Sequence, residues 1–307
     1  MDAVPQIFME SVCLSLDRDS LRASRYIYST WGTICYVTSK KVHTLRVLLD
    51  GEEKKIYAAA EPPRLYDTYR IAASLDSVDL KFVTNIRIET RTTYDSPQLT
   101  NNWKEITLDR LQRLVRFIAP TKNERHPLRY DPESLNSLSL KRGSEWINRK
   151  ILSLGLPVDS VNLEVSKEEA MEFFETAGLL YFVRYVAPNV EQSIVDTIIE
   201  KFVPIDDGSF SINNGLNRAQ MNKLFKKCVL SDKKVKVTLT LEFSTNSIAL
   251  THFFDYDKYY SEKEVLRQGM EVRCANRGEA RLKLQVRLIH VGWIEWLWDD
   301  ANEPWRV

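Results

Sequence analysis

The sequence predicts a mixed α/β fold with some α+β character. We expect a short N-terminal helical unit, then a repeat-like β/α region that ends in an antiparallel C-terminal hairpin. Three observations predict this order: helical spacing of apolar residues at the start, a strand–cap–helix pattern that recurs three times between residues 161 and 228, and two β-rich segments near the end. The expected regions are 1–40 (helical), 41–120 (mixed β/α) and 121–307 (repeat-like).

The first region, residues 4–31, predicts two or three short helices. Its leading apolar residues follow helical spacing, at Ile7, Phe8, Val12 and Leu16. Pro5 suits a first helical turn, where its missing N–H costs nothing. A polar break at 17–19 precedes a second helical pattern that runs from Ser20 to Trp31. Helices this small cannot bury a core alone, so their apolar surface must contact the remaining chain, a partner, or both.

The second region predicts a hairpin and two more strands. Residues 41–49 are β-rich, Asp50-Gly51 is a turn signal, and 54–58 can return as the paired strand. Pro62-Pro63 ends this unit. Segments 69–73 and 81–90 are further strands, and Thr107 is expected to cap a helix over 108–118. Residues 121–142 are expected to form a loop with at most a short helical turn.

The third region alternates strands and helices. Strands are expected at 161–165, 179–186, 210–212 and 235–243. Helix N-caps follow the first three strands, at Ser166, Asn189 and Asn217, each with Glu or Gln three residues later. Connections of this kind are right-handed, so the strands should be mostly parallel and the helices should lie on one side. Length alone leaves open an extended arc of repeats or a compact α/β sandwich.

The C-terminal part departs from this pattern. One more strand is expected at 246–254, followed by a hairpin from 271–275 and 280–291. The tail is rich in tryptophan, at Trp293, Trp296 and Trp298. These rings either close the end of the sheet as a hydrophobic cap or contact a substrate, since tryptophan is common at binding hot spots. We favour the cap and keep the substrate contact as the alternative.

Composition excludes several classes of function. The chain has 307 residues, is 44% hydrophobic, and carries 43 basic and 42 acidic residues, so no global charge favours nucleic acid or a membrane surface. No apolar run reaches the roughly twenty residues of a membrane span. The four histidines and four cysteines show no metal-ligand spacing, and no Gly-rich phosphate loop or nucleophile elbow occurs. We therefore predict no catalytic residue, no metal and no cofactor.

Scattered cysteines and the lack of a basic leader favour reduced thiols in the cytoplasm or nucleus. The basic residues on the third helix, Lys223, Lys226 and Lys227, are expected to be a solvated face.

The opening of the chain resembles a divergent F-box, and more closely the F-box-like families of nematodes. The residues that carry the resemblance are Met1, Asp2, Val4, Pro5, Phe8, Val12, Leu16 and Trp31. It covers about the first forty residues, and the Leu-rich middle of the usual box is replaced by DRDSLRASRY.

The resemblance implies docking of a Skp-type adaptor and, through it, recruitment to a cullin–RING ubiquitin ligase with an unknown protein substrate. The expected docking residues are Val4, Pro5, Ile7, Phe8, Val12, Leu16 and Trp31. The alternative is a stand-alone binding scaffold whose first helices only cap the sheet. Burial of Phe8, Val12 and Trp31 against residues beyond Lys40 would favour the cap, and an exposed apolar patch would favour docking.

Overall fold

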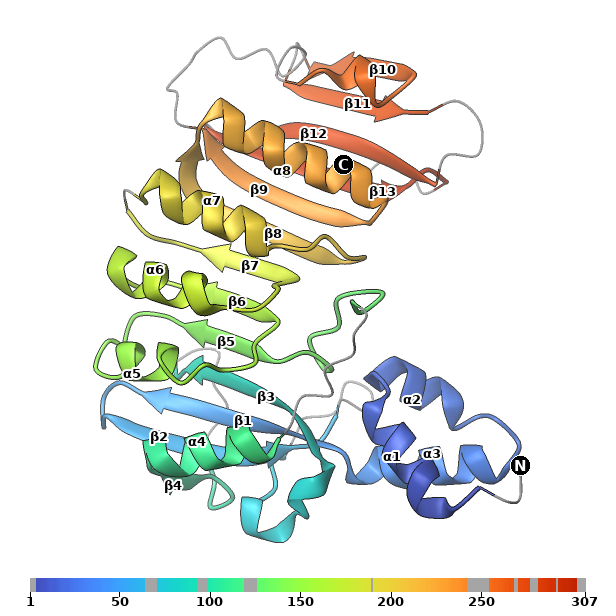
Figure 1. The fold of residues 1–307 in the computed structure, drawn as a ribbon, viewed down its shortest axis with the longest axis vertical. Helices are drawn as coiled ribbons and strands as arrows, with labels where there is room; N and C mark the ends of the chain where they lie inside the picture. Colours follow the sequence, from blue (N-terminus) through green and yellow to red (C-terminus); the bar gives the residue numbers. More distant parts are fainter. Residues whose placement is uncertain are drawn as a thin grey trace. The chain divides into compact units, whose positions relative to one another are not determined.

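A computed structural model describes residues 4–63, 71–92, 99–118, 126–188, 190–241, 254–267, 270–276, 281–290 and 292–302. It confirms the mixed α/β fold, the N-terminal helices and the C-terminal antiparallel hairpin (Figure 1). The chain forms two compact units, which are described separately. Unit 1 comprises Met1–Glu124 and Asp131–Val158, and unit 2 comprises Arg125–Tyr130 and Asp159–Val307. Residues 131–158 thus belong with the first unit, whereas the sequence analysis grouped them with the repeat-like region.

Unit 1 begins with three helices, α1 (Gln6–Ser15), α2 (Arg18–Ser24) and α3 (Thr30–Lys41). The helical pattern from Ser20 to Trp31 is therefore divided between α2 and α3. Asp17 caps α2 and Ser29 caps α3, each accepting a hydrogen bond from a backbone N–H in the first turn. α3 packs against both other helices. Together they enclose a small core of Met9, Cys13, Leu21, Ile34, Cys35 and Val42.

Two cysteines that lie far apart in the sequence meet in this small core. The Sγ atoms of Cys13 and Cys35 are 3.2 Å apart, on α1 and α3, and both thiols are free. Burial and the hydrogen bond to the neighbouring thiol raise the pKa of Cys13 to about 12. Both cysteines therefore act as small apolar side chains between the helices.

The sheet of unit 1 has the strand order β5-β3-β1-β2-β4. The strands are β1 (His43–Asp50), β2 (Lys55–Glu61), β3 (Val83–Thr90), β4 (Lys104–Ile106) and β5 (Ser137–Leu140). β1 and β2 form the predicted hairpin, which is joined by a four-residue turn. Lys54 adopts a left-handed conformation in this turn, and the Asp50 carboxylate accepts hydrogen bonds from two of its backbone N–H groups. β1, β3 and β5 are parallel, and β4 pairs antiparallel with β2. The helices are α4 (Leu108–Phe117), which Thr107 caps as predicted, and α5 (Asn148–Leu152).

One buried arginine joins the three N-terminal helices to this sheet. Arg18, the first residue of α2, is 4% exposed. Its Nη2 donates to Asn85 Oδ1 on β3 at 2.9 Å and to the carbonyl of His43 on β1 at 3.3 Å. Its backbone N–H donates to Ser134 Oγ at 2.8 Å. The helical unit is therefore held by a side chain that needs hydrogen bonds to stay buried.

Unit 2 contains the predicted strand–helix alternation. Its parallel strands are β6 (Ser160–Leu163), β7 (Phe182–Tyr185), β8 (Gly208–Leu216) and β9 (Val235–Leu241). Between them run α6 (Lys167–Thr176), α7 (Gln192–Lys201) and α8 (Arg218–Ser231), which lie on one face of the strands (Figure 1). Capping boxes at Ser166 and Asn217 are confirmed. α7 instead begins after Glu191, and Asn189 lies outside the described residues.

The C-terminal strands continue the sheet of unit 2 in antiparallel order, β10-β11-β12-β13-β9. They are β10 (Glu262–Leu266), β11 (Glu271–Ala275), β12 (Leu282–His290) and β13 (Trp293–Asp300). The predicted hairpin is β11–β12. The tail forms β13, which pairs with both β12 and β9 and so joins the antiparallel and parallel parts.

The structure corrects two of the expectations and leaves a third untested. Residues 71–73 of the predicted strand at 69–73 form only a single bridge, between Ala73 and Ala60. The loop expected at 121–142 contains strand β5, which alternates serine and leucine and pairs with β3. Most of the strand predicted at 246–254 lies outside the described residues.

Candidate functional site

The first turn of α1 carries the most exposed apolar side chains among the predicted docking residues. Ile7 is 75% exposed and Phe8 59% exposed, whereas the next residue, Met9, is buried in the core of the helical unit. Cys13, one turn further, is also buried, so α1 turns one side to the core and the other to solvent. Val4 and Pro5 precede the helix and are exposed, with Pro5 in the N-cap position.

The loop between α2 and α3 adds three exposed apolar residues, Tyr26, Ile27 and Tyr28. A close contact holds this loop against α3. A Cβ at Gly32 would lie 1.9 Å from the carbonyl oxygen of Ile27, so only glycine allows the approach. On α3 itself, Tyr36 and Val37 are also exposed. We call the set Val4, Ile7, Phe8, Tyr26, Ile27, Tyr28, Tyr36 and Val37 the apolar surface of the helical unit.

Cations lie over two of the aromatic rings on this surface. The Arg25 guanidinium is 4.7 Å from the centre of the Tyr26 ring, and Lys40 Nζ is 4.0 Å from the centre of the Tyr36 ring. A hydrogen bond from Lys40, together with its charge, lowers the pKa of the Tyr36 hydroxyl. Each of these two exposed rings therefore has a cation in contact with its face.

The structure divides the predicted docking residues into two groups. Val4, Pro5, Ile7 and Phe8 are exposed, as docking requires. Val12, Leu16 and Trp31 are half-buried, and Leu16 and Trp31 pack against the core of the helical unit. Sequence reasoning missed five exposed residues as docking candidates: Tyr26, Ile27, Tyr28, Tyr36 and Val37. The helix break before the Ser29 cap is the signal that could have placed Tyr28 in an exposed loop.

The tryptophans of the tail are mainly core residues. Trp296 is fully buried and Trp298 is 3% exposed, on the side of β13 that α8 covers, so neither can contact a substrate. The Trp298 indole N–H donates to the Tyr260 hydroxyl at 2.9 Å, inside the same cluster. Trp293, at the start of β13, is half-buried. The burial of Trp296 and Trp298 contradicts the alternative of a substrate contact for these two residues. The favoured cap at the end of the sheet is also wrong, because β13 lies inside the sheet, between β12 and β9.

Metal-binding groups or reactive thiols would indicate other functions for the described part of the chain. Those residues contain no group of three His, Cys, Asp or Glu side chains that could hold a metal ion. Burial raises the pKa values of Cys228 and Cys274, so these thiols stay protonated. Within the same residues, no helix is both long and apolar enough to cross a bilayer.

Comparison with known proteins identifies no relative: no family model, no curated protein and no solved structure matches this chain. The resemblance of the first forty residues to the nematode F-box-like families therefore stays a prediction.

Proposed function

We propose that this chain is a non-catalytic adaptor that recruits a protein substrate to a cullin–RING ubiquitin ligase. In this proposal the apolar surface of the helical unit docks a Skp-type adaptor protein, which contacts the cullin. The β/α region presents the surface that holds the substrate. The chain itself carries out no chemistry.

One observation carries the proposal: Ile7 and Phe8 remain exposed although the three helices already have a core of their own. Helices that served only to cap the sheet would turn their largest apolar side chains toward it. Large exposed apolar residues that gather in one small unit typically mark an interaction site. The residues quoted for the F-box-like resemblance lie in the same unit.

The size of the apolar surface is consistent with a docking site. Full burial of one large apolar side chain contributes about 1.5–3 kcal/mol, so Ile7 and Phe8 together contribute about 3–6 kcal/mol. A micromolar complex needs about 8 kcal/mol after the cost of association, so two side chains are not enough. The exposed residues of the α2–α3 loop and of α3 supply the additional area.

The proposal predicts that Ile7→Ala with Phe8→Ala weakens binding to a purified Skp-type adaptor protein at least tenfold. Both side chains are exposed, so the double variant should fold normally. The measurement is capture of the full chain by the immobilised adaptor protein over a range of concentrations. The matched control is Leu128→Ala with Leu230→Ala, which removes two similarly exposed leucines from unit 2. Absence of binding by the unaltered chain, or equal binding by the double variant, contradicts the proposal.

The second candidate function is a stand-alone binding scaffold whose helical unit is a cap. The buried bonds of Arg18 to β1 and β3 favour it, because they tie the helices to the sheet. The same capture experiment separates the two candidates. A scaffold is not retained by the adaptor protein at any concentration, whereas the proposed adaptor subunit is.

A further inference from the structure

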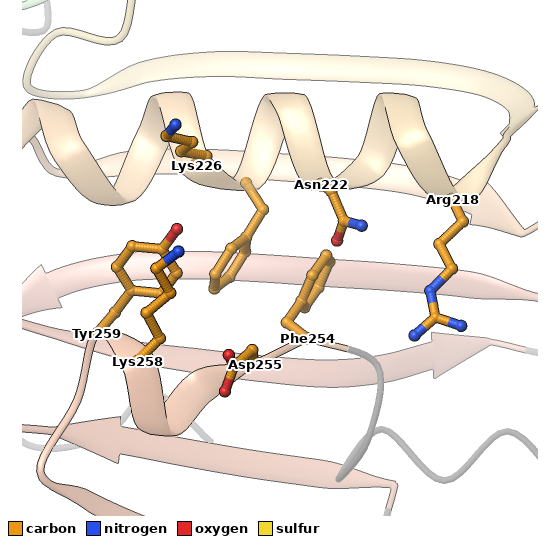
Figure 2. Close-up of a pocket in the computed structure, with 8 residues that line it drawn as sticks. Arg218, Asn222, Lys226, Phe254, Asp255, Lys258 and Tyr259 are labelled. Atoms are coloured by element: carbon orange, nitrogen blue, oxygen red, sulfur yellow. The ribbon is translucent and has the colours of Figure 1, made fainter.

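Unit 2 contains a pocket between α8 and residues 254–259 that no function described so far uses. Its volume is about 270 Å³. One wall comes from α8 and the other from the short turn that follows residue 253 (Figure 2). The lining residues are Arg218, Asn222, Phe225, Lys226, Phe254, Asp255, Lys258 and Tyr259. The four from α8 fall at helical spacing, so they share one side of that helix.

The floor of the pocket is aromatic and rigid. The rings of Phe225 and Phe254 stack with their centres 4.1 Å apart and their planes 7° apart. Tyr259 meets Phe225 edge to face at 6.0 Å. Behind them, the ring of Trp296 packs against both phenylalanines. A floor supported in this way keeps its shape, so binding of an apolar group requires little loss of conformational entropy from the floor's own side chains.

The cations of the pocket differ from the other cations of α8. Lys223 pairs with Glu200 at 2.9 Å, and Lys227 Nζ donates to the carbonyls at the end of α7. Arg218, Lys226 and Lys258 have no carboxylate partner in the part of unit 2 that the structure describes. With the single carboxylate of Asp255, the pocket carries a net charge of about +2, which favours an anionic ligand.

These charges lie at the two ends of the pocket. Figure 2 shows Arg218 at one end, Lys226 and Lys258 at the other, and Phe254 between them. Arg218 and Lys226 are eight residues apart on α8, which is about 12 Å along the helix axis. An extended peptide rises about 3.3 Å per residue, so two side chains four residues apart are separated by about 13 Å. The spacing thus matches a peptide with acidic side chains at positions i and i+4.

The middle of the pocket favours a peptide over a nucleic acid. In Figure 2, Asn222 descends from α8 and ends beside the Phe254 ring, and Asp255 lies on the opposite wall with its carboxylate turned away from Asn222. Both side chains carry groups that can bond to peptide C=O and N–H groups. The Asp255 carboxylate would repel a nucleic acid, which carries a phosphate at every residue, whereas a peptide can place an uncharged residue beside it. Phe225 is 2% exposed and Phe254 7% exposed, so the half-buried ring of Tyr259 is the part of the floor most accessible to an apolar side chain. The volume lies below the 300–1,000 Å³ of most small-molecule sites, which suits one apolar side chain.

We propose that this pocket binds an acidic peptide segment of a partner protein, with an apolar side chain on the Phe225–Phe254–Tyr259 floor and a carboxylate at each end. Arg218 bonds one carboxylate, and Lys226 with Lys258 bonds the other. The assignment of that partner as the recruited substrate rests on the proposed function. Binding of the peptide itself does not.

The test measures fluorescence anisotropy of a labelled peptide, Glu-Ala-Phe-Ala-Glu between Gly-Ser flanks, with the full chain. We expect saturable binding that Arg218→Ala with Lys258→Ala weakens at least tenfold. Asn222→Asp should also weaken it, because the new carboxylate repels the peptide. The matched control, Lys223→Ala, removes a cation of the same helix outside the pocket and should change the affinity less than twofold.

Competing peptides separate recognition from simple charge attraction. A peptide with Ser in place of Phe, and one with the two Glu residues adjacent, should bind at least fivefold more weakly. Equal binding of all three peptides, stronger binding of a single-stranded oligonucleotide, or no binding at millimolar peptide overturns the proposal. Adaptor capture by the same protein sample reports separately on the proposed function.

Discussion

Single charged residues hold neighbouring strands of unit 2 together on the face of the sheet away from α8. Glu295 on β13 is 3% exposed and accepts from Arg287 on β12 at 2.7 Å. Lys236 on β9 lies 2.6 Å from the other oxygen of the same carboxylate. Burial disfavours the charged form of Glu295, but the bonds from Lys236 and Arg287 outweigh it and lower its pKa. One carboxylate thus links the parallel and antiparallel parts of the sheet.

Glu295→Gln should lower the free energy of unfolding by about 2 kcal/mol at pH 7, because two charge-assisted hydrogen bonds are lost. A carboxyl with a lowered folded-state pKa stabilises the protein above its unfolded pKa of about 4.3, and this contribution disappears as the pH falls through the folded value. Urea unfolding of both proteins should therefore give a difference that is constant above about pH 6 and shrinks below about pH 4.3.

Glu264→Gln on β10 is the control for this prediction, since Glu264 is exposed and makes no ion pair within the described residues. It should change stability by less than about 0.5 kcal/mol at any pH. A Glu295→Gln effect that does not depend on pH would mean that packing, and not charge, explains its loss of stability.

Among the secondary-structure elements, the three N-terminal helices depend most on one contact. Their own core contains six residues, of which two are cysteines, and this is too small to stabilise a fold by itself. The remaining stability comes from contacts with the sheet, above all from the buried side chain of Arg18, which bonds to β1 and β3. The three helices therefore have a core of their own, but their stability depends on contact with the sheet.

Arg18→Ala should lower the free energy of unfolding by about 2–3 kcal/mol. The variant loses hydrogen bonds from a charged donor, and Asn85 and a backbone carbonyl are left with fewer partners. The loss should be local. Hydrogen exchange should speed up in α1, α2 and α3 while the amides of β6 to β9 keep their protection. Lys40→Ala, an exposed cation in the last turn of α3, is the control and should cost at most about 1 kcal/mol. Uniform faster exchange throughout the chain would show that Arg18 supports the whole fold.

For the whole molecule, the two proposed binding sites belong to different compact units. The apolar surface of the helical unit is in unit 1, and the pocket beside α8 is in unit 2. The two sets of lining residues share no side chain. Substitutions without shared partners usually have additive effects.

Ile7→Ala with Phe8→Ala should therefore leave the affinity for the acidic peptide unchanged within twofold. Arg218→Ala with Lys258→Ala should leave capture by the Skp-type adaptor protein unchanged within the same limit. Both variants are measured in both assays. A loss in the opposite assay would show that the units are energetically coupled or that one variant is misfolded, which far-UV circular dichroism distinguishes.

Local signals predicted much of the fold. The capping boxes at Ser166 and Asn217 and the cap at Thr107 were correct because a cap is decided within four residues of chain. Strand β9 was correct because its alternation is strict. Strand β5 was missed because four residues of alternating serine and leucine are a weak signal until β3 lies beside them. Ile7 and Phe8 were predicted as docking residues, whereas the exposed Tyr28 and Tyr36 were not.

The sequence by itself determined the order of helices and strands, their caps and the apolar opening of the chain, because these depend on neighbouring residues. Only the tertiary structure decided where the C-terminal tail goes. β13 enters the sheet between β12 and β9, which buries Trp296 and Trp298 and supports the floor of a pocket. Strand pairing joins residues more than fifty positions apart, and no local pattern specifies which edge a strand will meet.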